Sequence, residues 1–110
     1  MPAYAIANLQ DVDFGPDIVA YLQAIDPTLA PFEGVFLLHG SAVEVVEGPF
    51  VGDLVVIAFP DLDRARAWYR SAAYQAILPL RTRNARCWAI LADGVVAGHR
   101  AVDLLDRVAA

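Results

Sequence analysis

The sequence of 110 residues predicts one small α+β domain in which two helices cover one face of a four-stranded antiparallel sheet. Short β-rich segments alternate with two longer segments whose apolar residues recur at helical spacing. No segment repeats, and no Gly- or Ser-rich linker divides the chain. A chain of this length buries roughly two-thirds of the surface that its unfolded form exposes, so one core without disulfides can hold the fold together.

A strand and a helix are expected first. Residues 4–9, "YAIANL", predict a short strand that the polar run "QDVD" ends. Pro16 suits the first turn of a helix. The residues after it form one apolar stripe at helical spacing: Ile18, Tyr21, Leu22 and Ile25. Pro27 and Pro31 should kink or end this helix, because proline lacks the amide proton that a helix interior uses.

Two strands are expected next. Residues 35–48, "VFLLHGSAVEVVEG", predict one strand that a bulge or bend breaks around Gly40 and Ser41. Residues 54–59, "LVVIAF", are apolar throughout, which is typical of a strand covered on both faces. We therefore expect this strand at the centre of the sheet, with helices on one face and a second subunit on the other.

A second helical region and a last strand complete the domain. The carboxylate of Asp61 can accept the free amide protons of a first helical turn, and apolar residues recur at helical spacing after it. Ser71 suits the start of a second helical piece, which Pro79 should interrupt. Residues 87–94, "CWAILADG", predict the last strand.

The resulting order is βαββαβ, as in the split-βαβ, ferredoxin-like arrangement. We expect residues 1–94 to form this domain. In the remaining tail, residues 95–110, the apolar rhythm of Val102, Leu105 and Val108 predicts a short amphipathic helix.

The composition favours a homodimer. With 58% hydrophobic and 19% charged residues, a monomer this small would lack polar cover for its surface. Two sheets packed face to face, the dimeric α+β barrel, would hide the free sheet face of each subunit. Alanine accounts for 20 of the 110 residues, so part of the high hydrophobic fraction needs no interface.

Charge, length and cysteine content exclude several kinds of partner. The net charge of −5 repels nucleic acid and anionic membrane surfaces, so neither is expected as a partner. The longest apolar run, residues 54–59, is far short of the roughly 20 residues that cross a bilayer. Cys87 is the only cysteine, so we expect no internal disulfide and no cysteine-based metal centre, and a cytoplasmic location is the default.

Several stretches carry a resemblance to a known family. The stretches are "AVEVVEG" at 42–48, "VVIAFP" at 55–60 and "WYRSAAYQAILPLRTRNA" at 68–85. Gly34 and Gly40, which precede the first stretch, also belong to the pattern. Over about residues 3–94 the sequence resembles the family named domain of unknown function 1330 (DUF1330). More remotely, it is similar to the dimeric α+β barrel superfamily, which includes cofactor-free monooxygenases, haem-using relatives and muconolactone-isomerase-like enzymes.

The resemblance implies a ferredoxin-like fold and a dimer, and it assigns no chemistry. Two positions depart from the family pattern. His39 stands where the family tends to place an arginine, so an anion-binding role of that arginine is not carried over. Glu33 stands where the family often has a second glycine.

Arg81 is the first candidate for a ligand-binding residue. It falls on the "PLR" of the family pattern, and a guanidinium at a helix end can hold a carboxylate or an enolate through two parallel hydrogen bonds. The alternative is a structural arginine that ties the last helix to the sheet or to an acidic partner. Tyr69, Tyr74 and Tyr4 can each present a ring and a hydroxyl to the same ligand, or pack in the core with a satisfied hydroxyl.

His39 is the candidate for proton transfer, because imidazole changes charge near neutral pH; a structural or exposed histidine is the alternative. Glu44 should project opposite to Val43 and Val45 on a strand, because side chains alternate along it. There it either meets solvent or the dimer interface, or it binds the ligand or orients His39. No second histidine or carboxylate lies at ligand spacing from His39, since His99 is in the tail. We therefore expect no metal and no other cofactor.

These residues lead to two competing hypotheses. In the first, a homodimer holds a small, partly apolar and anionic organic molecule between each sheet and its helices. Any chemistry would be that of a cofactor-free oxygenase, isomerase or cyclase, with His39 as proton carrier. In the second, the protein is a non-catalytic dimer, either ligand-binding or purely structural with a filled core. Haem or metal binding is a third hypothesis, and a cavity lined by Arg81 and the tyrosines would favour the first.

Overall fold

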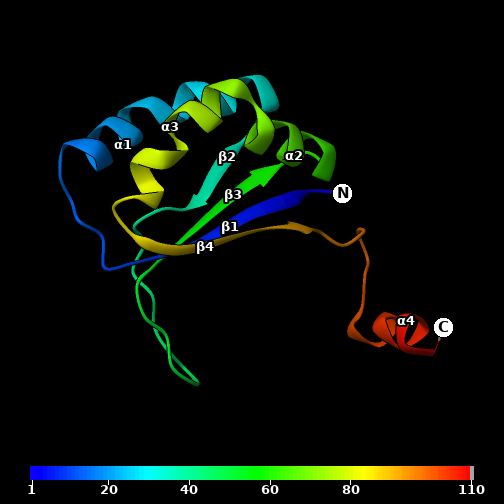
Figure 1. The fold of residues 1–110 in the computed structure, drawn as a ribbon. Helices are drawn as coiled ribbons and strands as arrows, with labels where there is room; N and C mark the ends of the chain where they lie inside the picture. The colour runs from blue at the N-terminus through cyan, green and yellow to red at the C-terminus, as the bar shows by residue number, and fades with distance from the viewer. Residues whose placement is uncertain (110) are drawn as a thin grey trace.

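The computed structural model describes residues 1–109 and has a sheet covered on one face by helices (Figure 1). The four strands are β1 (Ala3–Gln10), β2 (Val35–Leu38), β3 (Asp53–Phe59) and β4 (Arg86–Asp93). They pair antiparallel in the order β2-β3-β1-β4, which is the ferredoxin-like arrangement. The covering helices are α1 (Pro16–Leu29), α2 (Leu62–Arg70) and α3 (Ala72–Thr82). The prediction that the apolar strand at residues 54–59 is central is confirmed, because β3 pairs with both β2 and β1.

The register of the strands sorts side chains between the two sheet faces. On β1 the odd-numbered residues face the helices, and Ala3 is fully buried beneath them. Ala5 is paired with Ile57 of β3 and Leu91 of β4, which share that face. The even-numbered residues of β1, beginning with Tyr4, lie on the opposite face.

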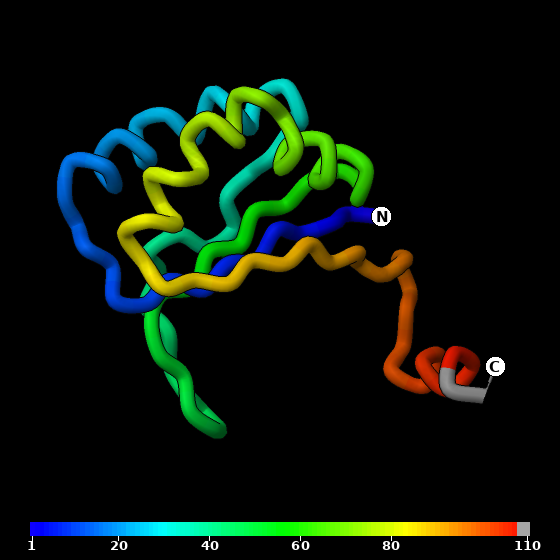
Figure 2. The backbone as a smooth tube through the Cα atoms, viewed as in Figure 1, coloured from blue at the N-terminus to red at the C-terminus, as the bar shows by residue number. Residues whose placement is uncertain are grey.

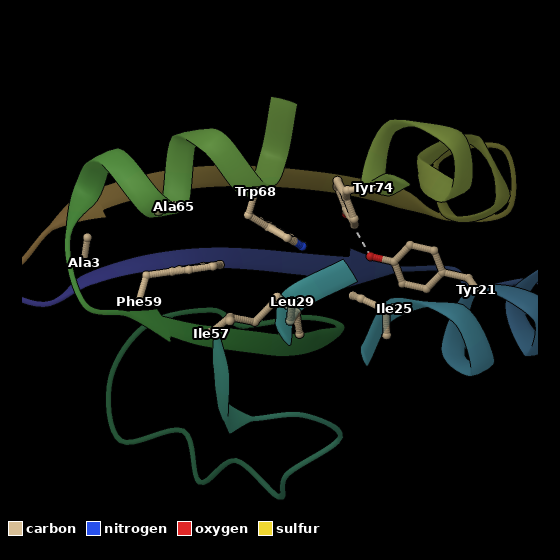
Figure 3. Close-up of a cluster of buried hydrophobic side chains, with 9 residues drawn as sticks. All are labelled: Ala3, Tyr21, Ile25, Leu29, Ile57, Phe59, Ala65, Trp68 and Tyr74. Atoms are coloured by element: carbon tan, nitrogen blue, oxygen red, sulfur yellow. Dashed lines mark hydrogen bonds between the residues drawn. The ribbon is translucent and has the colours of Figure 1, made fainter. Parts of the chain in front are cut away.

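The core lies between the sheet and the helices (Figure 3). Phe59 is 2% exposed, and its ring centroid lies 5.4 Å from that of Trp68 on α2. Burial of a side chain of this size contributes about 2 kcal/mol to stability. Gly34 precedes β2 in close contact with this core, because a Cβ there would approach Leu29 and Phe59 within 2.8 Å. A larger residue at position 34 would therefore displace core side chains.

Two predicted helix starts are confirmed. The Asp61 carboxylate accepts a hydrogen bond from the backbone N–H of Arg64 at 2.8 Å and begins α2. The Ser71 hydroxyl accepts one from the backbone N–H of Tyr74 at 3.2 Å and begins α3. Each cap is worth about 1 kcal/mol.

The prediction that Pro27 and Pro31 kink or end the first helix, and that Pro79 interrupts the later one, holds only in part. α1 ends at Leu29, two residues before Pro31, but Pro27 lies inside α1 and Pro79 inside α3, so neither of these ends its helix. Each proline removes one hydrogen bond of the helix ladder, but the turns that follow are held by tertiary packing. Leu29 and Arg81, in those turns, are 3% and 5% exposed.

The prediction of a long strand at residues 35–48 is also wrong. The strand ends at Leu38, and residues 39–52 form an irregular loop. Gly40 and Gly48 adopt positive φ angles of 67° and 70°, which strand residues do not use. The loop extends away from the sheet on the side opposite the helices (Figure 2).

The C-terminal tail projects on that same side of the sheet (Figures 1 and 2). It contains a 3₁₀ turn, Ala101–Asp103, and the short helix α4, Leu104–Ala109. Leu104 and Leu105 are 51% and 64% exposed. Across residues 1–109, no helix has the length and apolar character needed to cross a membrane.

Candidate functional site

A cavity of about 280 Å³ lies between the sheet and the covering helices. Its lining comes from all four strands and from α1, α2 and α3. Leu22, His39, Ala89 and Ile90 line it and are solvent-exposed, so the cavity opens to solvent beside them.

The hollow follows from small residues on the inner face of the sheet. In the segment "AYAIA" of β1, alanines alternate with large side chains, and Ala5 and Ala7 line the cavity. Ala89 of β4 is paired with Ala7 and extends this floor. Close packing of a core normally requires larger side chains at such positions, so the floor leaves space that the helices above do not fill.

Aromatic residues of the helices form the opposite wall. The ring centroids of Trp68 and Tyr74 lie 4.1 Å apart, and those of Tyr69 and Tyr74 lie 5.6 Å apart. The indole N–H of Trp68 donates to the Thr28 hydroxyl of α1 at 3.0 Å, and that hydroxyl donates to the backbone carbonyl of Ile25 at 2.6 Å. These bonds fix the wall against α1.

Arg81 supplies the charge of the site. It is 5% exposed, and its Nη1 donates to Cys87 Sγ at 3.1 Å while its Nη2 donates to Tyr74 Oη at 3.4 Å. Its guanidinium carbon lies 5.9 Å from the centroid of the Tyr21 ring, within range of a cation–π contact.

Arg81 has no carboxylate partner among residues 1–109. Four exposed arginines do form ion pairs, with N–O distances between 2.9 and 3.6 Å: Arg64, Arg66, Arg86 and Arg100. The buried arginine therefore contacts only neutral groups.

Burial and hydrogen bonding set the ionisation of Arg81 and Tyr21. Burial lowers the pKa of the Arg81 guanidinium, but its neighbours Tyr74, Tyr21 and Cys87 together raise that pKa by more, so the guanidinium stays charged. Burial, together with the neighbouring Tyr74 hydroxyl, raises the pKa of Tyr21 well above its ordinary value of 10.0. Tyr21 therefore remains a neutral phenol that can donate a hydrogen bond.

Four of the predicted site residues line this cavity: Arg81, Tyr69, Tyr74 and His39. His39 follows the end of β2, and its imidazole stacks on the ring of Phe36 with centroids 4.6 Å apart. It lies where the cavity meets solvent.

Tyr4 and Glu44 do not reach the cavity. Tyr4 is paired with Ala58 and Ala92 on the sheet face opposite the helices, because side chains alternate along a strand and Ala3 faces inward. Glu44 lies exposed in the loop of residues 39–52, since the strand predicted for it ends at Leu38. The proposed pairing of Glu44 with His39 is absent from the ion pairs and hydrogen bonds of residues 1–109.

Sequence reasoning missed Tyr21 as a site residue. It was assigned to the apolar stripe of α1, and it does belong to the core, at 9% exposed. Its hydroxyl lies 2.8 Å from that of Tyr74, and the two side chains point toward one another from α1 and α3 (Figure 3). The signal that could have identified it is a hydroxyl within an otherwise apolar helix stripe, because a buried hydroxyl needs a polar partner.

Residues 2–95 match the domain of unknown function DUF1330. The chain belongs to the DUF1330 family. One departure of this chain from the family pattern concerns the backbone: Glu33 adopts a left-handed conformation with φ of 59°, which explains why a glycine suits this position. No curated protein matches the chain.

Solved structures similar to this DUF1330 chain share its fold. A protein of unknown function from Rhodopseudomonas palustris is 16% identical, with a TM-score of 0.64, 86% of this chain covered and 83% of the other. A dimeric ferredoxin-like protein of unknown function from Thermobifida fusca is 17% identical, with a TM-score of 0.56 and coverages of 86% and 92%. Another dimeric ferredoxin-like protein of unknown function, from Jannaschia, is 12% identical, with a TM-score of 0.57 and coverages of 86% and 100%. At these identities the likeness establishes the ferredoxin-like fold.

Proposed function

We propose that this DUF1330 protein binds a small, partly apolar organic anion in the cavity between its sheet and helices. The observation that carries the proposal is Arg81, a buried guanidinium on the cavity wall with no carboxylate partner among residues 1–109. An unpaired charge in an apolar interior costs several kcal/mol, a cost that an anionic ligand would offset.

The remaining lining sets the character of the ligand. Apart from Arg81, His39 and three tyrosines, the lining residues are alanine, leucine, isoleucine, valine, phenylalanine and tryptophan. A volume of about 280 Å³ lies near the lower end of ligand pockets, which run from roughly 300 to 1,000 Å³. We therefore expect a ligand with an apolar body about the size of one ring.

The proposal includes a homodimer in which the open sheet faces pack together as an α+β barrel. Trp88 of β4 and Val35 of β2 are 49% and 60% exposed on that face. The radius of gyration, 15.8 Å, exceeds the roughly 13 Å of a compact domain of this length, because the loop and the tail project beyond that face. A second copy seated between these projections would cover the apolar side chains. Two of the structural relatives are described as dimeric.

A cytoplasmic location, compatible with the single free thiol of Cys87, belongs to the same proposal.

Binding without turnover is favoured over catalysis. His39 is the one lining residue suited to proton transfer near neutral pH, and it is exposed beside the cavity opening. A cofactor-free oxygenase or isomerase would use His39 as its base and Arg81 to hold the resulting oxyanion. The geometry supports the binding half of this scheme, because the buried charge and the apolar cavity lie together.

Filling the cavity tests the proposal. Ala7→Leu adds three carbon atoms to the cavity floor, so the unliganded protein should keep or raise its melting temperature while losing ligand binding. We expect millimolar benzoate, phenylacetate or salicylate to stabilise the wild type, by about 1.4 kcal/mol at ten times the dissociation constant. Thermal unfolding with and without each acid measures both effects.

Ala67→Leu is the matched control, because Ala67 is exposed on α2 and outside the cavity. It should respond to the acids as the wild type does. Equal stabilisation of Ala7→Leu and wild type by the acids would place their binding elsewhere and refute the proposal.

A further inference from the structure

The Tyr21–Tyr74 pair has one more hydrogen-bond proton than it uses. The two hydroxyl oxygens lie 2.8 Å apart and share a single hydrogen bond, in which either can be the donor. Tyr74 Oη also accepts from Arg81 Nη2, which cannot accept in return. Two phenols carry two protons and the shared bond takes one, so the second has no acceptor among residues 1–109.

Arg81 adds further donors at the same place. A guanidinium carries five N–H groups, and two of its nitrogens have one protein partner each, Cys87 and Tyr74. Tyr21, Tyr74 and Arg81 all line the cavity. This end of the cavity therefore has an excess of donors, from a cation and from a neutral phenol, which an acceptor from outside the chain would satisfy.

The charge of the site selects a monoanion. Arg81 is the only arginine on the cavity lining, and the chain contains no lysine. A single carboxylate would neutralise it one to one. A phosphate ester, which carries close to two negative charges at neutral pH, would leave an uncompensated negative charge among apolar side chains.

We infer that the ligand is a monocarboxylate with an apolar body of about one ring, bound through Arg81 and one phenol of the Tyr21–Tyr74 pair. A carboxylate offers two acceptor oxygens, so one can face the guanidinium and the other the phenol. A phenolate or an enolate has one charged oxygen for both donors. The inference rests on the proposed function, and it adds the class of anion and the role of the two tyrosines in selecting it.

Isothermal titration calorimetry with four probes tests this inference. The probes are benzoate, neutral benzamide of the same shape, phenyl phosphate, and 4-nitrophenolate at a pH at which it is ionised. We expect wild type to bind benzoate at least about ten-fold more tightly than each of the others, as expected for a hydrogen bond to a charged group worth about 1.5–3 kcal/mol.

Phenylalanine substitutions then test the phenols. Tyr21→Phe and Tyr74→Phe each keep one phenolic proton, whereas the double variant keeps none, so benzoate affinity should fall most in the double variant, by about ten-fold or more. The double variant removes both partners of the shared hydrogen bond and also the Tyr74 acceptor of Arg81 Nη2, so circular dichroism checks that it is folded. Tyr4→Phe, on the opposite sheet face, is the control and should bind benzoate like wild type.

The outcomes separate this inference from the proposed function. If phenyl phosphate or 4-nitrophenolate binds as tightly as benzoate, or the folded double variant keeps full benzoate affinity, the inference is overturned while an anion site at Arg81 stands. If wild type binds none of the four probes, the proposed function fails and the inference fails with it.

Discussion

Replacing Arg81 by methionine is expected to stabilise the unliganded protein and to abolish the binding of organic anions. Methionine has a similar length and a flexible apolar side chain that suits a cavity wall, and it removes a buried charge that no carboxylate of residues 1–109 neutralises. Tyr74 would keep its bond to Tyr21. Replacing buried charges by apolar side chains of similar volume often stabilises proteins by about 1–4 kcal/mol. Thermal or urea unfolding would measure this change, and benzoate titration the loss of binding.

A structural arginine would behave in the opposite way. If Arg81 served mainly to tie α3 to Cys87 and Tyr74, Arg81→Met would lower stability. The matched control is Arg83→Met, which makes the same charge change on an exposed side chain near the end of α3. Arg83→Met should have the same stability and the same benzoate affinity as the wild type, within experimental error. A destabilised Arg81→Met protein that still binds benzoate would contradict the account.

Trp88→Asp is expected to convert the homodimer into monomers. Trp88 is 49% exposed in one subunit, on the sheet face that the proposed dimer buries, and it lies outside the cavity lining. Because a two-fold dimer carries the substitution twice, two carboxylates would lose water at the interface, each at a cost of several kcal/mol. The dimer dissociation constant should rise by at least about 100-fold, since 1.4 kcal/mol corresponds to a factor of ten.

Sedimentation velocity at micromolar concentration measures this effect. Wild type should sediment near twice the 11.9 kDa subunit mass, and Trp88→Asp near the mass of one subunit. Val19→Asp is the control, because Val19 is 40% exposed on α1 and on the other side of the molecule from the open sheet face. A wild type that sediments as a monomer, or a Trp88→Asp protein that remains dimeric, would exclude the sheet-to-sheet barrel.

Much of the fold could be predicted because short-range signals agree with the tertiary structure. The caps at Asp61 and Ser71 and the continuous apolar strand β3 are local features whose physical consequences are direct. Local rules misled at Pro27 and Pro79, where packing of the next turn outweighs one lost hydrogen bond. They also misled after Leu38, where valine-rich residues have strand propensity but no partner strand.

The site was predicted less completely, for a different reason. Arg81 stood out through the family pattern, but its lack of an acidic partner depends on long-range packing that no spacing reveals. Tyr4 could be placed on the face opposite Ala3 by alternation alone, yet alternation does not say which face the helices cover. The cavity itself depends on alanines of β1 and β4, strands that are distant in sequence and adjacent in the sheet.

We expect the cavity beside Arg81 to hold an organic carboxylate. A crystal structure of the protein with 4-bromobenzoate would show this, because anomalous scattering locates the bromine. We expect the bromine over the alanine floor near Ala7, with the carboxylate within hydrogen-bond distance of the Arg81 guanidinium. A cavity closed by its own side chains, or bromobenzoate bound only away from Arg81, would contradict this expectation.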